Sequence, residues 1–427
     1  MEKIHIFHTN DVHSHFQYWP RMQAYIGAQR GLLAGKGEAS FLMDVGDFLD
    51  RSNLYTEATL GRGNIELLNA AQYDVVTIGN NEGITFGYDD LFHLYDEASF
   101  DVVVGNFQAL EGENPNWLKT HTILETARGT KIGVVSATAQ YEQFYRELGW
   151  AVSDARASIK AQTQQLRSQV DMLVCLSHLG VTEDELLANE CPELDVIFGA
   201  HTHHIFETGK LVNGVLLTGG GKFGQYAGHL TIYYDHAQQG IVKIEDVLLE
   251  SALLPAVPNE QNFVHKLYLQ AKEMMSEPLF QTHKMYTKEW FHYSPLANLF
   301  AELILAHTDA NIAMFNAGIF IQSLEKGNVT AADLHEMLPH PINLCVIEIK
   351  GSELKEIYMQ AQNEDWPNLQ LKGLGFRGVV FGKLLTYNFH MNKHRELFVQ
   401  GELADLNKTY KMVTLDLFTF GFFFPNF

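Results

Sequence analysis

The first half of the chain alternates short apolar runs with longer stretches of mixed polarity. The apolar runs between residues 1 and 250 are typical of buried strands, whereas stretches such as 63–72 and 154–169 have the polarity of helices. Asp154 stands where an N-cap residue would open the second of these helices. Strands that alternate with helices in this way predict an α/β domain built from layers. The later apolar runs 211–218 and 228–234 predict a hairpin that closes the same sheet.

A second, smaller α/β unit is predicted in the C-terminal part of the chain. The segment 254–259 contains two prolines and has the composition of a linker. An amphipathic helix follows it, and Pro278 ends that helix; its apolar face carries Phe263, Leu267, Ala271 and Met275. We therefore expect a domain at 1–254, a linker and bridging helix at 255–278, and a second domain at 279–427.

Capping residues mark where helices begin in this second unit. Ser294 precedes Pro295, which is favoured at the first position of a helix. Thr330 and Asp333 have the spacing of a capping box. The tail 417–425 is unusually aromatic, so we expect it to pack into the second domain.

Five of the apolar strands in the first domain run directly into residues that bind metals. In an open α/β sheet the binding crevice lies at the carboxyl ends of the strands, which is where these residues stand. Their number exceeds what one ion uses when the protein supplies four to about six ligands. We therefore expect two metals that share a bridging carboxylate, with these ligands: Asp11, His13, Asp47, Asn80, His178, His201 and His203.

The spacing of the ligands gives some local geometry. Asp11 and His13, like His201 and His203, are two residues apart and so lie on one side of an extended backbone. Each pair either converges on one centre or straddles two adjacent centres. Gly46 before Asp47 permits a close approach of the backbone. Carboxylate, amide and imidazole ligands without thiolate favour manganese, iron, cobalt or zinc.

Charge and cysteine content narrow the range of partners. The formal net charge is −21, which repels a nucleic-acid backbone and anionic membranes. Small anionic substrates remain compatible with this charge if metal ions hold them. The three cysteines are scattered, and neither a transmembrane run nor a signal pattern is visible. We expect a cytoplasmic protein that binds neither nucleic acid nor membrane; the oligomeric state stays open.

The ordered motifs Asp-x-His, Gly-Asp, Gly-Asn, His and Gly-x-His-x-His resemble those of the calcineurin-like metallophosphoesterases. The C-terminal half is similar to the 5′-nucleotidase C-terminal domain, so nearly the whole chain resembles the two-domain 5′-nucleotidase/UDP-sugar hydrolase family. This resemblance implies a four-layer α/β/β/α sandwich followed by a smaller α/β domain. It also implies two ligand sets joined by Asp47: Asp11, His13, Asp47 and His203 for one metal, and Asp47, Asn80, His178 and His201 for the other.

The chain departs from this family beside the asparagine ligand. Family members have a histidine next, and an aspartate three residues after it, as a dyad that stabilises the transition state or protonates the leaving group. Asn81 and Ile84 stand at these positions here. Asparagine donates a hydrogen bond but delivers no proton at neutral pH. We expect a substrate whose leaving group needs little protonation, unless His15, His204 or Glu82 supplies the proton.

The second domain departs from the family as well. Where the family has Asn-x-Gly-Gly-Ile-Arg, this chain has Asn316-Ala317-Gly318-Ile319-Phe320, which places Phe320 at the position of the phosphate-binding arginine. Arg377, on a glycine-flanked loop, is the remaining candidate for a cation that faces the phosphate. The predicted substrate-binding residues are therefore Asn316, Phe320 and Arg377.

We expect a metal-dependent phosphoesterase that acts on a nucleotide or a related small phosphate ester. A metal-bridging hydroxide held at Asp47 would attack phosphorus in line with the leaving group, next to Asn81. One alternative is the same chemistry on a phosphodiester, a pyrophosphate or a nucleotide sugar. Two others are a non-enzymatic nucleotide-binding protein and a structural scaffold.

Overall fold

The computed structural model describes residues 1–371, 373 and 375–424, which form two compact units, Met1–Gln270 and Ala271–Phe427. Helix α9 (Gln261–Met274) contains the limit between them. Its early residues Phe263 and Leu267 pack against the core of the first unit, and Ala271 is buried. The domain limits expected from the sequence stay a prediction.

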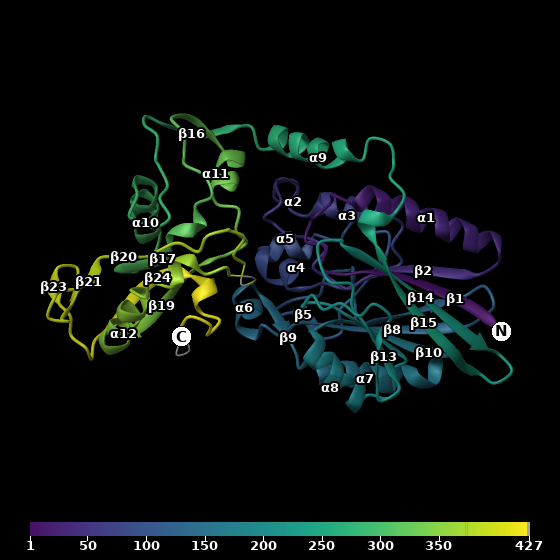
Figure 1. The fold of residues 1–427 in the computed structure, drawn as a ribbon. Helices are drawn as coiled ribbons and strands as arrows, with labels where there is room; N and C mark the ends of the chain where they lie inside the picture. Colours follow the sequence, from purple (N-terminus) through teal and green to yellow (C-terminus); the bar gives the residue numbers. More distant parts are fainter. Residues whose placement is uncertain (372, 374, 425–427) are drawn as a thin grey trace. The chain divides into compact units, whose positions relative to one another are not determined.

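The first unit contains two large sheets (Figure 1). The seven-stranded sheet has the order β15 (Gly240–Glu250), β14 (Tyr226–Asp235), β1 (Glu2–Thr9), β2 (Ala39–Asp44), β3 (Val75–Val76), β4 (Asp101–Val103) and β6 (Leu118–Lys119). The six-stranded sheet has the order β12 (Lys210–Val212), β13 (Val215–Thr218), β11 (Val196–Gly199), β10 (Met172–His178), β8 (Lys131–Thr138) and β7 (His121–Glu125). Neighbouring strands from β1 to β4, and from β8 through β10 and β11 to β13, are parallel.

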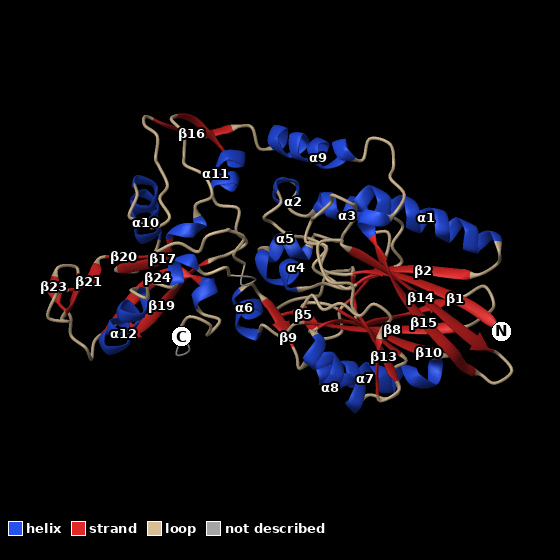
Figure 2. Cartoon of the chain, in the orientation of Figure 1, coloured by secondary structure: helices blue, strands red, loops and turns tan. Residues whose placement is uncertain are grey.

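Helices cover the outer faces of both sheets (Figure 2). Between the sheets lies an apolar core to which Ile6 of β1 and Val174 of β10 both belong. Side chains of α1 (Trp19–Gly35) and α3 (Arg62–Ala70) pack on the seven-stranded sheet, and those of α7 (Ala155–Leu166) and α8 (Val181–Glu190) pack on the six-stranded sheet. This arrangement confirms the four-layer α/β/β/α sandwich.

The predicted hairpin of 211–218 with 228–234 is wrong. The first run forms its own hairpin, β12–β13, in the six-stranded sheet, whereas the second lies in β14, which pairs antiparallel with β1 in the seven-stranded sheet. The apolar pattern shows that both runs are strands but does not tell which buried sheet each one joins. The connection 219–225 therefore crosses from one sheet to the other.

The second unit is built on a four-stranded sheet with the order β19 (Leu344–Lys350), β24 (Thr409–Leu415), β17 (Ile312–Asn316) and β20 (Leu384–Tyr387). Its main helices are α10 (Pro295–His307), α11 (Ala331–Met337) and α12 (Gly351–Ala361). The predicted caps are confirmed, because Ser294 Oγ accepts from Ala297 N and Thr330 Oγ1 accepts from Asp333 N. Two small sheets complete the unit: β16 (Pro278–Thr282) with β18 (Gly327–Thr330), and β21 (Phe389–Met391), β22 (Leu397–Val399) and β23 (Glu402–Leu403).

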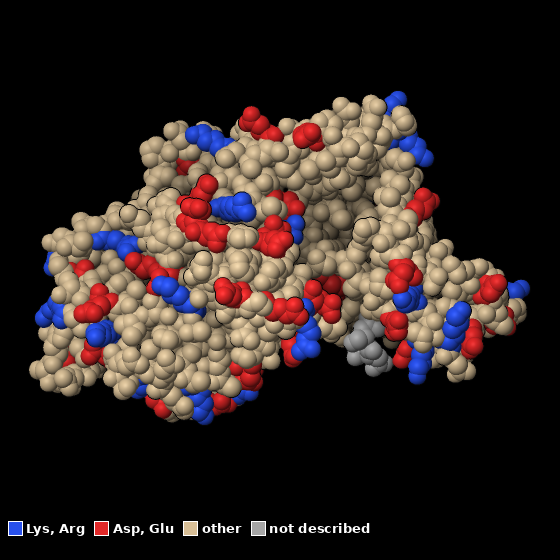
Figure 3. Space-filling view, turned by 180° about the vertical axis from the view of Figure 1, so that it is seen from behind, with Lys and Arg blue, Asp and Glu red and all other residues tan. Residues whose placement is uncertain are grey.

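The aromatic tail packs into the second unit as expected. Leu417, Phe418, Phe423 and Phe424 are buried in its core, while Phe422 is 64% exposed. Pro425, the last residue of the predicted segment, lies outside the described residues. Among the described residues, no helix is both long enough and apolar enough to cross a membrane. On the face drawn in Figure 3, the described basic side chains lie scattered among acidic ones.

Candidate metal centre

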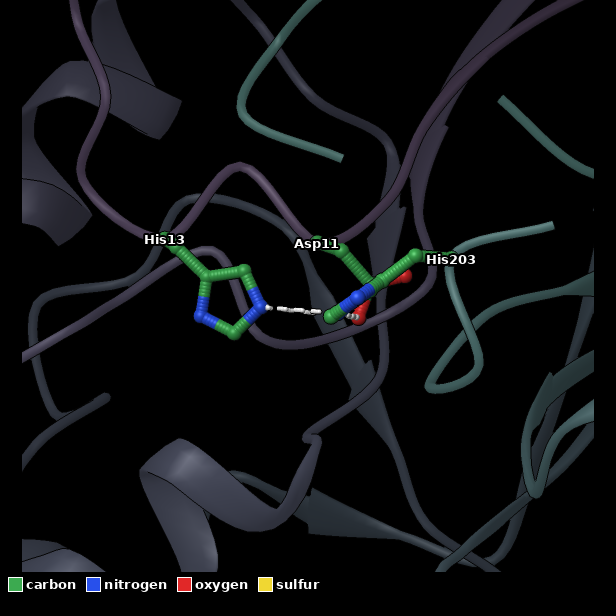
Figure 4. Close-up of side chains that lie close together, drawn as sticks. All are labelled: Asp11, His13 and His203. Carbon is green, nitrogen blue, oxygen red and sulfur yellow. Dashed lines mark hydrogen bonds and ion pairs between the residues drawn. The ribbon is translucent and has the colours of Figure 1, made fainter. Parts of the chain in front are cut away.

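Strand ends and the start of one short helix bring the seven predicted ligands together. Asp11 and His13 follow β1, Asp47 follows β2, and Asn80 opens α4 (Asn80–Thr85); His178 ends β10, and His201 and His203 follow β11. Ligand atoms of Asp11, His13 and His203 lie within 4.8 Å of one another, and so do those of Asp11, Asp47 and His178. In Figure 4 the His13 ring points toward His203 beside the Asp11 carboxylate. The remaining two ligands contact each other, with His201 Nδ1 2.9 Å from Asn80 Oδ1. They join the cluster through the His201 backbone N–H, which donates to Asp11 Oδ2 at 3.1 Å.

Five of the seven ligands have a left-handed backbone conformation. The φ angles are 47° at Asp11, 49° at His13, 53° at Asp47, 70° at His201 and 55° at His203. A positive φ is uncommon outside glycine, and Asp, Asn and His tolerate it best. The turns after β1, β2 and β11 therefore use strained backbone to aim the ligands, as is typical of functional sites. Nothing in the apolar pattern of the sequence predicted this feature.

Asp47 lies between two of the histidines. Its Oδ2 is 3.7 Å from His13 Nε2 and 3.5 Å from His178 Nε2. Two glycines make room for it: a Cβ on Gly46 would lie 2.5 Å from the Gly79 nitrogen, and a Cβ on Gly79 would overlap Asp47 Oδ1. The expected close approach at Gly46 is thus confirmed, and Gly79 has the same role on the facing loop.

The orientation of His178 leaves a buried acceptor atom for a cation. His178 Nδ1 is 2.7 Å from the Val45 carbonyl oxygen, which only accepts, so Nδ1 carries the proton. The other nitrogen, Nε2, is buried and has no hydrogen-bond partner among the described residues. Metal-binding histidines usually donate their second N–H to a carbonyl or carboxylate in this way. His13 Nε2 and His203 Nε2, 3.3 Å apart, likewise bring two ring nitrogens to one point.

The electrostatics of the cluster favour positive charge. Burial, the largest single effect, lowers the pKa of His178, but Asp47, Asp11 and the Val45 carbonyl together outweigh burial and raise this pKa to about 10. Burial alone raises the pKa of Asp47, but His178 and His13 hold it far below its usual range. Two carboxylates enclosed with four histidines therefore form a pocket that either protons or metal cations can neutralise.

Glu82 holds the loops that carry Asp47 and Asn80. Its carboxylate accepts hydrogen bonds from the backbone N–H groups of Asp47, Gly79 and Leu49 at 3.0, 2.8 and 2.9 Å. Burial and the Asp47 charge raise the pKa of Glu82 to about 7. Because backbone N–H groups donate to both of its oxygens, Glu82 positions the loops. From the sequence we considered Glu82 only as a proton donor and did not predict this role.

Asn81 binds the bridging candidate directly. Its backbone N–H donates to Asp47 Oδ1 and its side-chain amide donates to Asp47 Oδ2, both at 2.7 Å. Ile84, at the position of the family aspartate, packs against the apolar core. This edge of the centre therefore contains an amide and an aliphatic side chain where a proton-transfer pair is expected.

The two other proton-donor candidates differ in their surroundings. His204 is held by protein groups, since Nδ1 is 3.1 Å from Thr202 Oγ1 and Nε2 is 3.3 Å from the Thr218 carbonyl. Burial lowers the pKa of His204, which disfavours its charged form. His15 is exposed, and its Nδ1 is 2.9 Å from the His13 carbonyl oxygen.

Asn10 and Tyr141 are among the residues that touch the ligands and that sequence reasoning missed. Asn10 donates to Asp11 Oδ2 at 2.7 Å and to the Gly221 carbonyl at 2.8 Å. The Tyr141 hydroxyl lies 3.3 Å from His201 Nε2. The position of Asn10, directly before the ligand Asp11, was a signal in the sequence that could have identified it. Tyr141 lies 60 residues before His201, and no sequence pattern links the two.

The predicted substrate-binding residues lie in the second unit. Asn316 is buried at the end of β17 and donates to the Phe381 carbonyl at 2.8 Å. The Phe320 ring is enclosed in the apolar core against Phe300 and Phe315. The Arg377 backbone N–H donates to His340 Nδ1 at 3.0 Å. The roles of Asn316, Phe320 and Arg377 stay predictions.

Comparison with known proteins shows which family this constellation comes from. A family model described as calcineurin-like phosphoesterase matches residues 4–204, and one described as 5′-nucleotidase, C-terminal domain, matches residues 274–422. The metallophosphoesterase YunD of Bacillus subtilis is 37% identical over 99% of this chain and 94% of its own length. The chain belongs to the calcineurin-like phosphoesterases. The resemblance inferred from the sequence is thereby confirmed, together with the 5′-nucleotidase C-terminal domain.

Solved structures of two-domain relatives share the fold of this calcineurin-like phosphoesterase. The Haemophilus influenzae NAD nucleotidase has a TM-score of 0.66 at 17% identity, covering 99% of this chain and 90% of its own. A 5′-nucleotidase precursor from Thermus thermophilus has a TM-score of 0.58 at 19% identity, covering 98% of this chain and 90% of its own. Membership of the calcineurin-like phosphoesterases, and not these structures, indicates a hydrolase acting on phosphoric esters.

Proposed function

We propose that the protein hydrolyses the phosphate ester of a nucleotide at a centre of two divalent metals. The observation that carries the proposal is the position of Asp47 Oδ2 between His13 Nε2 and His178 Nε2, at 3.7 and 3.5 Å. The matched 5′-nucleotidase C-terminal domain and the names of two relatives, an NAD nucleotidase and a 5′-nucleotidase precursor, support a nucleotide substrate.

The proposed ligands divide into two sets that share Asp47. Their chemistry fits divalent metals because buried imidazole nitrogens face carboxylate oxygens without thiolate, and because His178 Nε2 is a buried acceptor without a protein donor among the described residues. One set is Asp11, His13, Asp47 and His203, and the other is Asp47, Asn80, His178 and His201. Manganese, zinc, iron and cobalt all suit such ligands, and we propose manganese as the first to test.

Divalent metals held by these residues would supply Lewis acidity toward phosphoryl oxygens and would lower the pKa of water. The chain itself orients the reaction. Asn81 donates to both oxygen atoms of Asp47 through its backbone and side-chain N–H groups, which fixes the carboxylate plane. Glu82 fixes the two loops below it. Asn81 has no proton to give to a departing oxygen, so the substrate contributes a leaving group that departs unprotonated or takes its proton from solvent.

Metal content and product identity test the proposal together. We expect protein purified without chelator and loaded with Mn²⁺ to hold about two metals per chain and to release inorganic phosphate from 5′-nucleotides. Asp47→Asn, which keeps the shape of the side chain, should lower both the metal content and the rate. Lys243→Gln, a change on β15, serves as the control. Retention of less than about one metal per chain by the loaded wild type would refute the proposal.

A further inference from the structure

The second unit contains an open cavity that has no part in the proposed function. Its volume, about 490 Å³, falls within the roughly 300–1,000 Å³ of small-molecule sites. Tyr358 of α12 lines one side, and this helix contacts β20 and β21, whose residues line the cavity as well (Figure 1). The loop before α10 contributes Tyr293, and the turn between β22 and β23 contributes Gln400.

The cavity lies toward the opposite end of β17 from the predicted substrate-binding residue Asn316. Asn388, which lines the cavity, donates from Nδ2 to the carbonyl oxygen of Asn311 at 3.0 Å. Asn311 directly precedes β17, whereas Asn316 is the last residue of that strand. A ligand in this cavity is therefore distinct from a substrate bound at Asn316.

Aromatic rings form much of the lining, and neighbouring groups hold two of them in place. Tyr293 is 47% exposed, yet its hydroxyl donates to the Thr386 carbonyl oxygen at 2.9 Å. The Tyr358 ring meets the buried Phe389 ring edge to face, with the centroids 6.0 Å apart. Because these rings are already ordered, a ligand that packs on them costs little side-chain entropy.

Polar side chains without a permanent charge complete the lining. Asn388, His390 and Gln400 are exposed, and their amide and imidazole groups offer both hydrogen-bond donors and acceptors. The walls that carry them are joined, since Gln400 N donates to the Asn388 carbonyl oxygen at 2.7 Å. Among the lining residues that the structure describes there is no lysine, arginine, aspartate or glutamate, so the cavity suits an uncharged ligand.

We propose that this cavity binds an uncharged sugar ring, carried either by a free sugar or by a nucleoside. The apolar face of such a ring packs on tyrosine or histidine rings, and its hydroxyl groups exchange hydrogen bonds with amide and imidazole groups. The proposal does not rest on the proposed function, because neither a metal nor a phosphate takes part in binding. A nucleoside released by that function nevertheless belongs to the same ligand class.

Binding in the absence of metal tests the cavity. The intact protein in a chelator is titrated with ribose, glucose and adenosine, and saturation-transfer NMR measures the affinity. Gln400→Gly removes the amide without backbone strain, because glycine readily adopts the φ of 53° at this position. His390→Phe removes the ring nitrogens and keeps a ring that can stack on Phe398, as His390 does at 5.5 Å and 13°. We expect each change to weaken binding about threefold or more.

Gln239→Gly is the matched control, because Gln239 is also exposed, has the same φ of 53° and precedes a glycine in the hairpin of β14 and β15. It should leave the affinity unchanged.

The three probes distinguish the sources of the sugar ring. Binding of ribose or glucose supports a free sugar, and binding of adenosine alone supports a nucleoside. Failure of the wild type to bind any probe, or equal affinities of the wild type, Gln400→Gly and His390→Phe, would overturn the proposal. These results leave the proposed function untouched, since its own test is metal content and phosphate release.

Discussion

At the scale of single residues, Gly79 leaves no room for a side chain beside the metal centre. A Cβ there would overlap Asp47 Oδ1 and lie 2.5 Å from His178 Cε1. We expect Gly79→Ala to lower the Mn²⁺ affinity about 100-fold or more, because the carboxylate must leave its place between the histidines. Titration with Mn²⁺ measures this. Gly31→Ala in α1, where a Cβ meets nothing within 4 Å, should leave the affinity unchanged; an equal effect of both changes would contradict the explanation.

Asn81 offers a second test at this scale. A histidine at this position restores a group that can donate a proton, although Ile84 leaves it without an acidic partner. We expect Asn81→His to raise kcat on aryl phosphates with poor leaving groups by about tenfold, and to change kcat little for good ones. The slope of log kcat against leaving-group pKa should become shallower than that of the wild type. An unchanged slope would mean that Asn81 does not face the leaving group.

The metal ligands could be predicted from the sequence, but the residues that hold the ligand loops in place could not. Asp11, Asp47 and His178 each follow or end a local apolar run, so their place at a strand end is visible in the sequence. The carboxylate of Glu82 instead meets Asp47 from 35 positions away, and such contacts depend on how the strands are ordered in space.

At the scale of elements, the pairing of β1 with β14 brings two histidines together. His5 Nδ1 lies 3.0 Å from His229 Nε2, with Glu38 3.3 Å from His5 Nε2 and Thr231 beside the pair. Burial, with His5 adding to it, lowers the pKa of His229 to about 4. An unfolded histidine has a pKa near 6.5, so unfolding takes up a proton between about pH 4 and pH 6.5. The stability contributed by neutral His229 is present above pH 6.5 and is lost as the pH falls through this window.

Replacement of His229 should therefore flatten the acid side of the stability profile. Between pH 7 and pH 5 we expect the thermal midpoint of His229→Gln to fall less than that of the wild type, by about 2 °C or more. His8 and Asp246 also affect the pKa of His229, so both residues are left unchanged in the variant. His93→Gln, at an exposed position of the first unit, is the control. Parallel profiles for the wild type and His229→Gln would exclude this histidine as the source of acid sensitivity.

Local sequence patterns predicted the helices and strands but not the order of the strands in the sheets. The α/β alternation and the capping residues Asp154, Ser294 and Thr330 predicted helices that the structure contains, because caps and periodicity act over a few residues. The partner of β14 is instead β1, which lies more than 200 residues earlier in the chain. Contacts between distant strands decide that pairing, and the local pattern is the same for either sheet.

At the scale of the whole molecule, the two units should respond differently to loss of metal. All seven proposed ligands lie in residues 1–270, so metal binding stabilises that unit directly. Saturation at about 1,000 times the dissociation constant contributes roughly 4 kcal/mol. We expect a chelator to lower one of two calorimetric transitions by several degrees and to leave the other in place. Equal shifts of both transitions, or none, would argue against a metal centre confined to the first unit.

The left-handed backbone at the ligands has a consequence for how the protein tolerates change. Each such residue costs about 1 kcal/mol or more that the rest of the fold must offset. Asp11, His13, Asp47, His201 and His203 all carry this conformation, and none of them is glycine. Substitutions that replace these ligands with glycine would therefore stabilise the metal-free protein and abolish its activity. The backbone of these five ligands adopts a conformation that is unfavourable for residues other than glycine. Mutations that abolish metal binding can therefore increase the free energy of unfolding of the metal-free protein.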